Sequence, residues 1–98
     1  MKTIYKYDID APVTAITMPE DSAILKVAYQ HERLRIWALV DTSNPPICRR
    51  FCIVGTGAPI PEGEIYAVWV ATVLTDDEQF VRHLFELFQT ATGKLGAI

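Results

Sequence analysis

Short segments in which apolar and polar residues alternate make up most of the chain. A period of two is typical of a β-strand that buries one of its faces. Proline and glycine residues, which interrupt strands, stand between these segments. The pattern predicts strands at residues 4–8, 13–18, 23–30, 34–40, 49–54 and 65–74.

Residues 23–40 have the pattern of a β-hairpin. On the second arm, an apolar set alternates with a basic and aromatic set: Leu34, Ile36, Ala38 and Val40 against Arg33, Arg35, Trp37 and Leu39. On the first arm, Leu25, Val27 and Tyr29 are predicted to face the core. Because His31-Glu32 between the arms is neither Asn-Gly nor Asp-Gly, we expect a loop longer than two residues.

Residues 65–74 are apolar on both faces, which predicts a central strand that is covered on both sides. The segment after them fits two structures. Thr75 to Glu78 has the S/T-x-x-E form of a helix capping box, and Phe80, Leu84 and Phe88 follow at helical spacing. Residues 81–87 also alternate as in a strand.

The expected fold is therefore mainly β, a small antiparallel sandwich or half-open barrel of six or seven strands. A single C-terminal helix on the sheet is the alternative. Residues 1–90 are expected to form one domain and residues 91–98 a frayed tail.

Composition narrows the function classes. The 98 residues carry a net charge of −3, and the pI is about 5.2. This argues against binding of duplex nucleic acid through bulk positive charge. No apolar run approaches the ~18 residues that span a bilayer, so we expect a cytoplasmic protein with no membrane partner. Cys48 and Cys52 are too far apart on a strand for a disulfide and lack further ligands for zinc, so free thiols and no metal or cofactor are expected.

Five short motifs follow one another along the chain. They are Lys-Thr-Ile-Tyr-Lys-Tyr at residues 2–7, Met-Pro at 18–19, Trp-Ala-Leu-Val at 37–40, Gly-Thr-Gly-Ala-Pro-Ile at 55–60 and His-Leu-Phe-Glu at 83–86. With them, residues 2–86 resemble a family of short bacteriophage and prophage proteins. That family is uncharacterised, so the resemblance implies a setting in the host cytoplasm and no mechanism. It also implies a hairpin turn before residue 83, which favours a strand for residues 80–87, although the acidic Asp76-Asp77-Glu78 departs from the family.

Two groups of residues are candidates for ligand binding. Backbone N–H groups of the Gly55-Thr56-Gly57 loop are able to form an anion-holding nest, and Arg49 and Arg50 lie just upstream. The alternative is a purely structural role, a tight turn that needs a positive φ at one or both glycines. Arg33, Arg35 and Trp37 combine cations with an indole. Such a group suits stacking on a base or binding to an acidic partner surface. The alternative is that these side chains pack beneath a second sheet layer or a subunit.

Catalysis has little support. Cys48 or Cys52 with His83 is the only thiol–imidazole combination, and no spacing supports it. His83 alternates with apolar residues and is expected to be a hydrogen-bonded core residue. The acids Asp76, Asp77 and Glu78 more often form a solvated turn. We expect no enzyme.

Three functions remain open. The first is a phage accessory binding module that blocks the surface of a host defence protein, in which Asp76, Asp77, Glu78, Glu62 and Glu64 would meet a basic groove. The second is a sponge for a nucleotide signal, which would hold a phosphate-containing ligand with Arg49, Arg50, Trp37 and the Gly55–Gly57 loop between subunits of a homo-oligomer. The third is a minor virion or assembly component.

Overall fold

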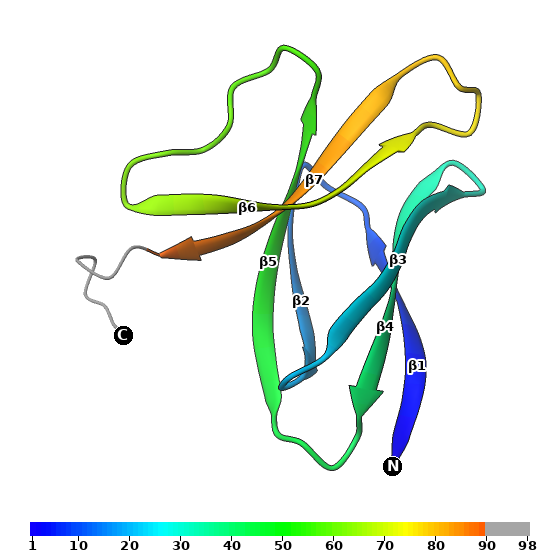
Figure 1. Ribbon diagram of the computed structural model, residues 1–98, viewed down its shortest axis with the longest axis vertical. Coiled ribbons are helices and arrows are strands. Elements are labelled where there is room, and N and C mark those ends of the chain that lie inside the picture. Colours follow the sequence, from blue (N-terminus) through cyan, green and yellow to red (C-terminus); the bar gives the residue numbers. More distant parts are fainter. Residues whose placement is uncertain (90–98) are drawn as a thin grey trace.

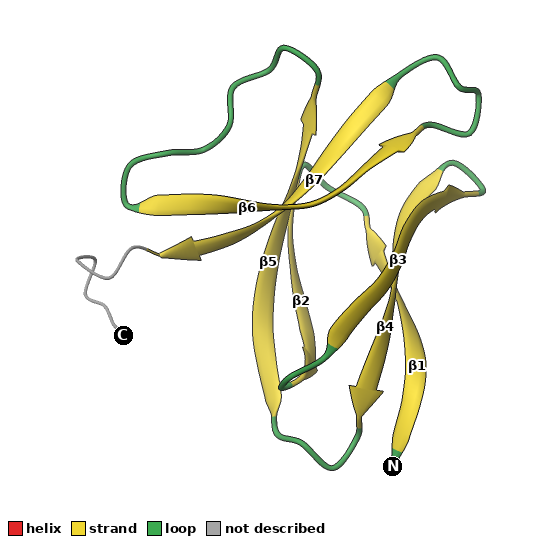
Figure 2. Cartoon of the chain, viewed as in Figure 1, coloured by secondary structure: helices red, strands yellow, loops and turns green. Residues whose placement is uncertain are grey.

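The computed structural model describes residues 1–89, which form seven strands and no helix (Figure 2). The strands are β1 (Lys2–Ile9), β2 (Val13–Pro19), β3 (Ala23–Gln30), β4 (Arg33–Asp41), β5 (Pro46–Gly55), β6 (Ile65–Leu74) and β7 (Val81–Gln89). They make a three-stranded sheet of order β1-β4-β3 and a four-stranded sheet of order β2-β5-β7-β6, and every pairing is antiparallel (Figure 1). The expected small β-sandwich is confirmed. The predicted tail at residues 91–98 lies outside the described residues.

The core lies between the two sheets and follows the alternation of the sequence. Leu34, Ile36, Ala38 and Val40 are all buried, as the pattern of β4 predicted. Phe51 of β5 and Leu84 of β7 meet them from the four-stranded sheet, and Met18 of β2 completes the cluster. The inward faces of both sheets thus share one apolar layer, which is the main favourable term for a domain of this size.

Residues 75–80 form a hairpin turn and not a helix start. Glu78 N–H donates to Thr75 O, Glu78 has a positive φ of 59°, and Thr75 N–H donates to Phe80 O. The Asp77 carboxylate accepts hydrogen bonds from the Thr75 hydroxyl and from Gln79 N–H. The capping residues therefore close a turn with the same side-chain chemistry that starts a helix, and β7 runs as a strand.

Three local expectations are wrong. The His31-Glu32 turn has only two residues, both with positive φ (53° and 64°), as in a type I′ turn. Leu25 is 54% exposed, because a β-bulge between Ile24 and Lys26 adds one residue and turns Leu25 outward.

The third concerns β6, which was expected at the centre of a sheet. It is instead the edge strand beside β7. In Figure 1 its first half and the end of β7 extend away from the three-stranded sheet. Apolar residues on both faces of β6 therefore do not report a central position within one chain.

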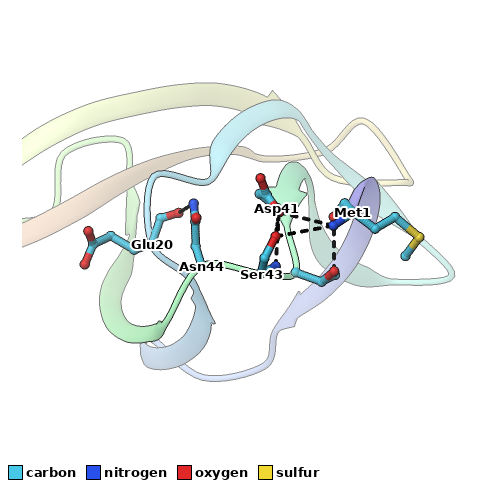
Figure 3. A network of polar contacts seen from close by, with 6 residues as sticks. Met1, Glu20, Asp41, Ser43 and Asn44 are labelled. Carbon is cyan, nitrogen blue, oxygen red and sulfur yellow. Dashed lines mark hydrogen bonds and ion pairs between the residues drawn. The ribbon is translucent and has the colours of Figure 1, made fainter.

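A polar network joins the chain start to the β4–β5 loop (Figure 3). The Met1 ammonium donates to the Asp41 carboxylate at 3.3 Å, and Ser43 donates to the same carboxylate through its hydroxyl and its N–H. The Asn44 amide donates to Glu20 O at 2.8 Å and so ties this loop to the β2–β3 turn. These bonds fix the register of β1 on β4, where Lys2 pairs with Asp41.

Candidate binding surfaces

The outward side of the three-stranded sheet carries two lysines on either side of a tryptophan. Lys6 of β1 and Lys26 of β3 both pair in register with Trp37 of β4. Their Nζ atoms lie 6.0 Å and 5.9 Å from the centroid of the Trp37 ring, which is the range of a cation–π contact. With Arg33 and Arg35 these residues form what we call the cationic face.

The two arginines of this face differ in exposure. Arg33 and Arg35 both approach the Asp8 carboxylate, at 3.9 Å and 3.3 Å. The Arg33 side chain is 59% exposed and that of Arg35 only 16%. The Nε of Arg35 is buried without a hydrogen-bond partner, which is uncommon for a buried donor. Arg33 is thus exposed on the same strand face as the half-buried Trp37, four residues away along β4, and the more buried Arg35 lies between them.

The lysines of the cationic face are not neutralised within residues 1–89. The ion pairs found there involve the N-terminus, Arg33, Arg35 and Arg49, and neither Lys6 nor Lys26. Lys6 donates only to the neutral amide oxygen of Gln30, at 3.2 Å. Sequence alternation alone does not show that β1 and β3 flank β4 and bring Lys6 and Lys26 to Trp37.

The Arg49 side chain is only 18% exposed and is fully engaged in hydrogen bonds. Its Nε and Nη2 donate to the two carboxylate oxygens of Glu86 at 2.7 Å and 2.8 Å, and its Nη1 donates to Ser22 O at 2.7 Å. The hydrogen bonds to Glu86 raise the pKa of Arg49. Six residues of extended strand, about 20 Å, separate Arg49 from Gly55. The structure therefore does not bring this guanidinium to the Gly55–Gly57 loop, and Arg50, the next residue, is half-buried.

The Gly55-Thr56-Gly57 loop is joined to β6 and β7 by a chain of hydrogen bonds. Gly57 has the positive φ that a tight turn requires, 90°. The Thr56 hydroxyl is 2.9 Å from Nε2 of His83, and Nδ1 of His83 is 3.0 Å from the Thr72 hydroxyl, which also accepts from Trp69 Nε1. His83 is hydrogen-bonded as expected, but it is half-buried at the surface and not in the core.

Two arginines that are far apart in the sequence, Arg33 and Arg82, lie near this loop. Gly55, Arg33 and Arg82 line an open groove of about 690 Å³ with Asp10 and Glu32. Because the groove holds acids of equal number, its charge is mixed, and it has no clear preference for an anion.

Asp76, Asp77 and Glu78 form an exposed acidic turn between β6 and β7. Asp76 accepts a hydrogen bond from the N–H of Glu32, so this turn is tied to the positive-φ turn of the β3–β4 hairpin. The hydroxyl of Thr75 and the N–H of Gln79 lower the pKa of Asp77. Both aspartates thus have structural partners within the domain.

A family model for a domain of unknown function, DUF7352, matches residues 1–93. The chain belongs to the DUF7352 family. Comparisons with curated proteins and with solved structures find no match.

The DUF7352 match includes every candidate residue considered above, from Lys6 to Glu86. Within residues 1–89 of this DUF7352 domain, no group of three His, Cys, Asp or Glu side chains is placed to hold a metal ion. The same residues contain no helix long and apolar enough to cross a membrane. The cationic face and the acidic turn are therefore the two charged surfaces to weigh.

Proposed function

We propose that this DUF7352 domain is a non-enzymatic binding module that occupies an acidic surface of a partner protein with its cationic face. The observation that carries the proposal is the placement of Trp37 between Lys6 and Lys26, two cations without an ion pair in the described residues. An aromatic ring with flanking cations provides both contact area and charge, and tryptophan and arginine are the residues that most often dominate interface energetics.

The separation of charge on the domain also supports an acidic partner surface. The domain has a net charge of −3, yet Lys6, Lys26 and Arg33 gather on one sheet face. A positive patch on an acidic protein steers an acidic partner to one orientation and disfavours others. Because the acidic total works against bulk attraction to nucleic acid, an acidic protein surface is the better fit.

The biological setting that we propose rests on the resemblance described above. In the cytoplasm of a host bacterium, a phage or prophage accessory protein of this size would act by covering a surface of a host protein. Interference with a host defence protein is the role that we put first. This supports the choice of assay partner and does not depend on any catalytic group.

The test compares two matched double variants in the full chain. Lys6→Ala with Lys26→Ala removes two positive charges from the cationic face. Ala15→Glu with Thr17→Glu is the control, since it changes net charge by the same amount at exposed positions of β2, on the other sheet. Poly-L-glutamate serves as the acidic probe, and quantitative pull-downs from host extract compare the same variants. We expect the lysine variant to bind at least about tenfold more weakly, a loss of about 1.4 kcal/mol, with a steeper effect at low salt.

Three results would overturn this assignment. Equal losses for both double variants would mean that only net charge matters. Tighter binding of a single-stranded oligonucleotide than of poly-L-glutamate would indicate a nucleic-acid surface. Loss of binding only when Asp76, Asp77 and Glu78 are together changed to Lys would support the other version, in which the acidic turn meets a basic groove.

The nucleotide sponge is less well supported as a second candidate. The residues proposed to hold the nucleotide do not lie together within one chain. Arg49 is hydrogen-bonded to Glu86, and Trp37 is on the other sheet from Gly55. Native mass spectrometry of the protein purified from its host would detect a retained nucleotide and would revive this candidate. Detection of the chain in purified particles would favour the virion role instead.

A further inference from the structure

The strand β6 presents an unpaired edge. In the four-stranded sheet it pairs with β7 on one side only, and no described strand is hydrogen-bonded to its other side, although β3 of the other sheet approaches it. Its ten residues extend for about 33 Å, and the backbone N–H and C=O groups of its free side require partners from water or from another strand.

The three other edge strands carry charges or prolines that discourage pairing, and β6 does not. β1 has Lys2, Lys6 and Asp8, and β3 has Lys26 and a bulge. β2 follows Pro12 and ends at Pro19, which cannot donate to a ladder. Residues Ile65–Leu74 contain no charge and no proline. Charges and prolines are usual means by which proteins block edge pairing, and β6 is the one edge strand among residues 1–89 that has neither, although its register on β7 shifts between Trp69 and Ala71.

The side chains around this edge are apolar and exposed. Trp69 is 60% exposed, Tyr66 is 49% exposed and stacks on Phe88, which is 37% exposed. With about 150–250 Å² for each aromatic residue, these fractions leave about 300 Å² of aromatic surface uncovered on each copy. With Val68, Leu74 and the strand backbone added, two copies expose on the order of 1,000 Å² along β6, about the area that a specific interface buries.

We propose that β6 pairs antiparallel with β6 of a second copy of this chain to form a two-fold symmetric dimer with a continuous eight-stranded sheet. An isologous contact needs a self-complementary surface, and an uncharged strand meets its own copy without opposing like charges. β6 then becomes a central strand with both of its backbone edges paired, and its large apolar side chains meet those of the second copy across the strand pair. The inference does not depend on the cationic face, which belongs to the other sheet.

The charges that flank β6 determine how the affinity of the proposed dimer depends on salt. Glu62 and Glu64 precede the strand, and Asp76 and Asp77 follow it. Antiparallel pairing brings the first pair of one copy near the second pair of the other, at both ends of the interface. Like charges at the ends confine pairing to the uncharged residues, and salt that screens them strengthens the dimer. Binding of an acidic partner by the cationic face has the opposite salt dependence.

The experiment measures the mass of the full chain by sedimentation equilibrium over a wide concentration range at low and high salt. Trp69→Lys and Tyr66→Lys place a charge on the proposed interface. Val13→Lys and Leu25→Lys are controls, because they add the same charge at exposed apolar positions of the edge strands β2 and β3. We expect twice the chain mass of 11.0 kDa for the parent protein. The affinity of the dimer should be at least about tenfold weaker for the β6 variants and nearly unchanged for the controls.

Amide hydrogen exchange of the unaltered protein gives a readout that does not depend on any variant folding. Peptides from residues 65–74 should gain protection as protein concentration rises, while peptides from β1 and β3 should not. A monomer at every concentration, or a dimer that Trp69→Lys and Val13→Lys weaken equally, would overturn the proposal. Concentration-independent exchange of residues 65–74 in a dimeric protein would place the interface elsewhere and would also overturn it.

Discussion

Replacement of Glu86 by Gln should destabilise the domain more than any surface substitution. Glu86 accepts two hydrogen bonds from Arg49 at 2.7 Å and 2.8 Å, and the two side chains are only 10% and 18% exposed. Glu86→Gln keeps the shape but removes the charge, which leaves a guanidinium in the interior with Ser22 O and the Met18 sulfur as its remaining partners.

The expected loss follows from the cost of an uncompensated buried charge. Removal of one partner of a buried ion pair typically costs about 3–5 kcal/mol. Since Arg49 keeps the bond to Ser22 O and some exposure, we expect about 3 kcal/mol. In a domain of this size, that loss lowers the melting temperature by at least about 12 °C.

Urea unfolding followed by circular dichroism measures this loss, and a double-mutant cycle isolates the pair. Arg49→Met with Glu86→Leu fills the same space with apolar atoms, so the double variant should be within about 1 kcal/mol of the parent. The cycle then gives a large coupling energy. If Glu86→Gln costs less than about 1 kcal/mol, or if the losses from Arg49→Met alone and Glu86→Leu alone simply add in the double variant, the ion pair between the neighbouring strands β5 and β7 does not stabilise the fold.

Two further predictions concern a turn and a pH dependence. His31→Asn with Glu32→Gly should raise the free energy of unfolding by about 1 kcal/mol in urea titrations, because both positions have positive φ, which these residue types adopt more readily; no gain, or a loss, would refute a type I′ turn there. The pKa of Asp41 is lowered to about 2 by hydrogen bonds from Ser43 and by the N-terminal ammonium. Its contribution to stability is therefore complete above its unfolded pKa near 4 and is lost as pH falls toward 2, and Asp41→Asn should remove that part of the acid dependence in circular dichroism titrations while Asp10→Asn retains it.

The strand β4 could be predicted because it buries a single face, whereas β5 buries the neighbours Phe51 and Cys52, which lie on opposite faces. The four apolar residues of β4 alternate without a break, and all four are buried. A bulge breaks this logic on β3, where Ile24 and Val27 both pack against the core although they are three apart. No residue in the sequence marks that extra position, so the outward direction of Leu25 could not be predicted.

The partners of the polar candidates could not be predicted from spacing. Arg49 and Glu86 are 37 positions apart and meet only because β5 pairs with β7. The sequence places Arg49 beside a glycine-rich loop, and chain proximity suggested a shared anion site. On a strand, however, neighbouring residues point to opposite faces, so Arg49 turns inward while Arg50 faces away. Chain proximity is a poor guide to shared chemistry in a β-protein.

The position of β6 links the sequence pattern to the proposed assembly. A strand that is apolar on both faces predicts cover on both sides, and within one chain β6 is an edge with Trp69 and Tyr66 exposed. The pattern and the single-chain fold agree only if something else supplies the second neighbour. The strand β6 of a second copy meets this need. It offers a full set of backbone partners, and the two copies repel each other only at the acidic ends. The proposed β6–β6 dimer would supply the neighbour that β6 lacks, as an uncharged strand aligned antiparallel.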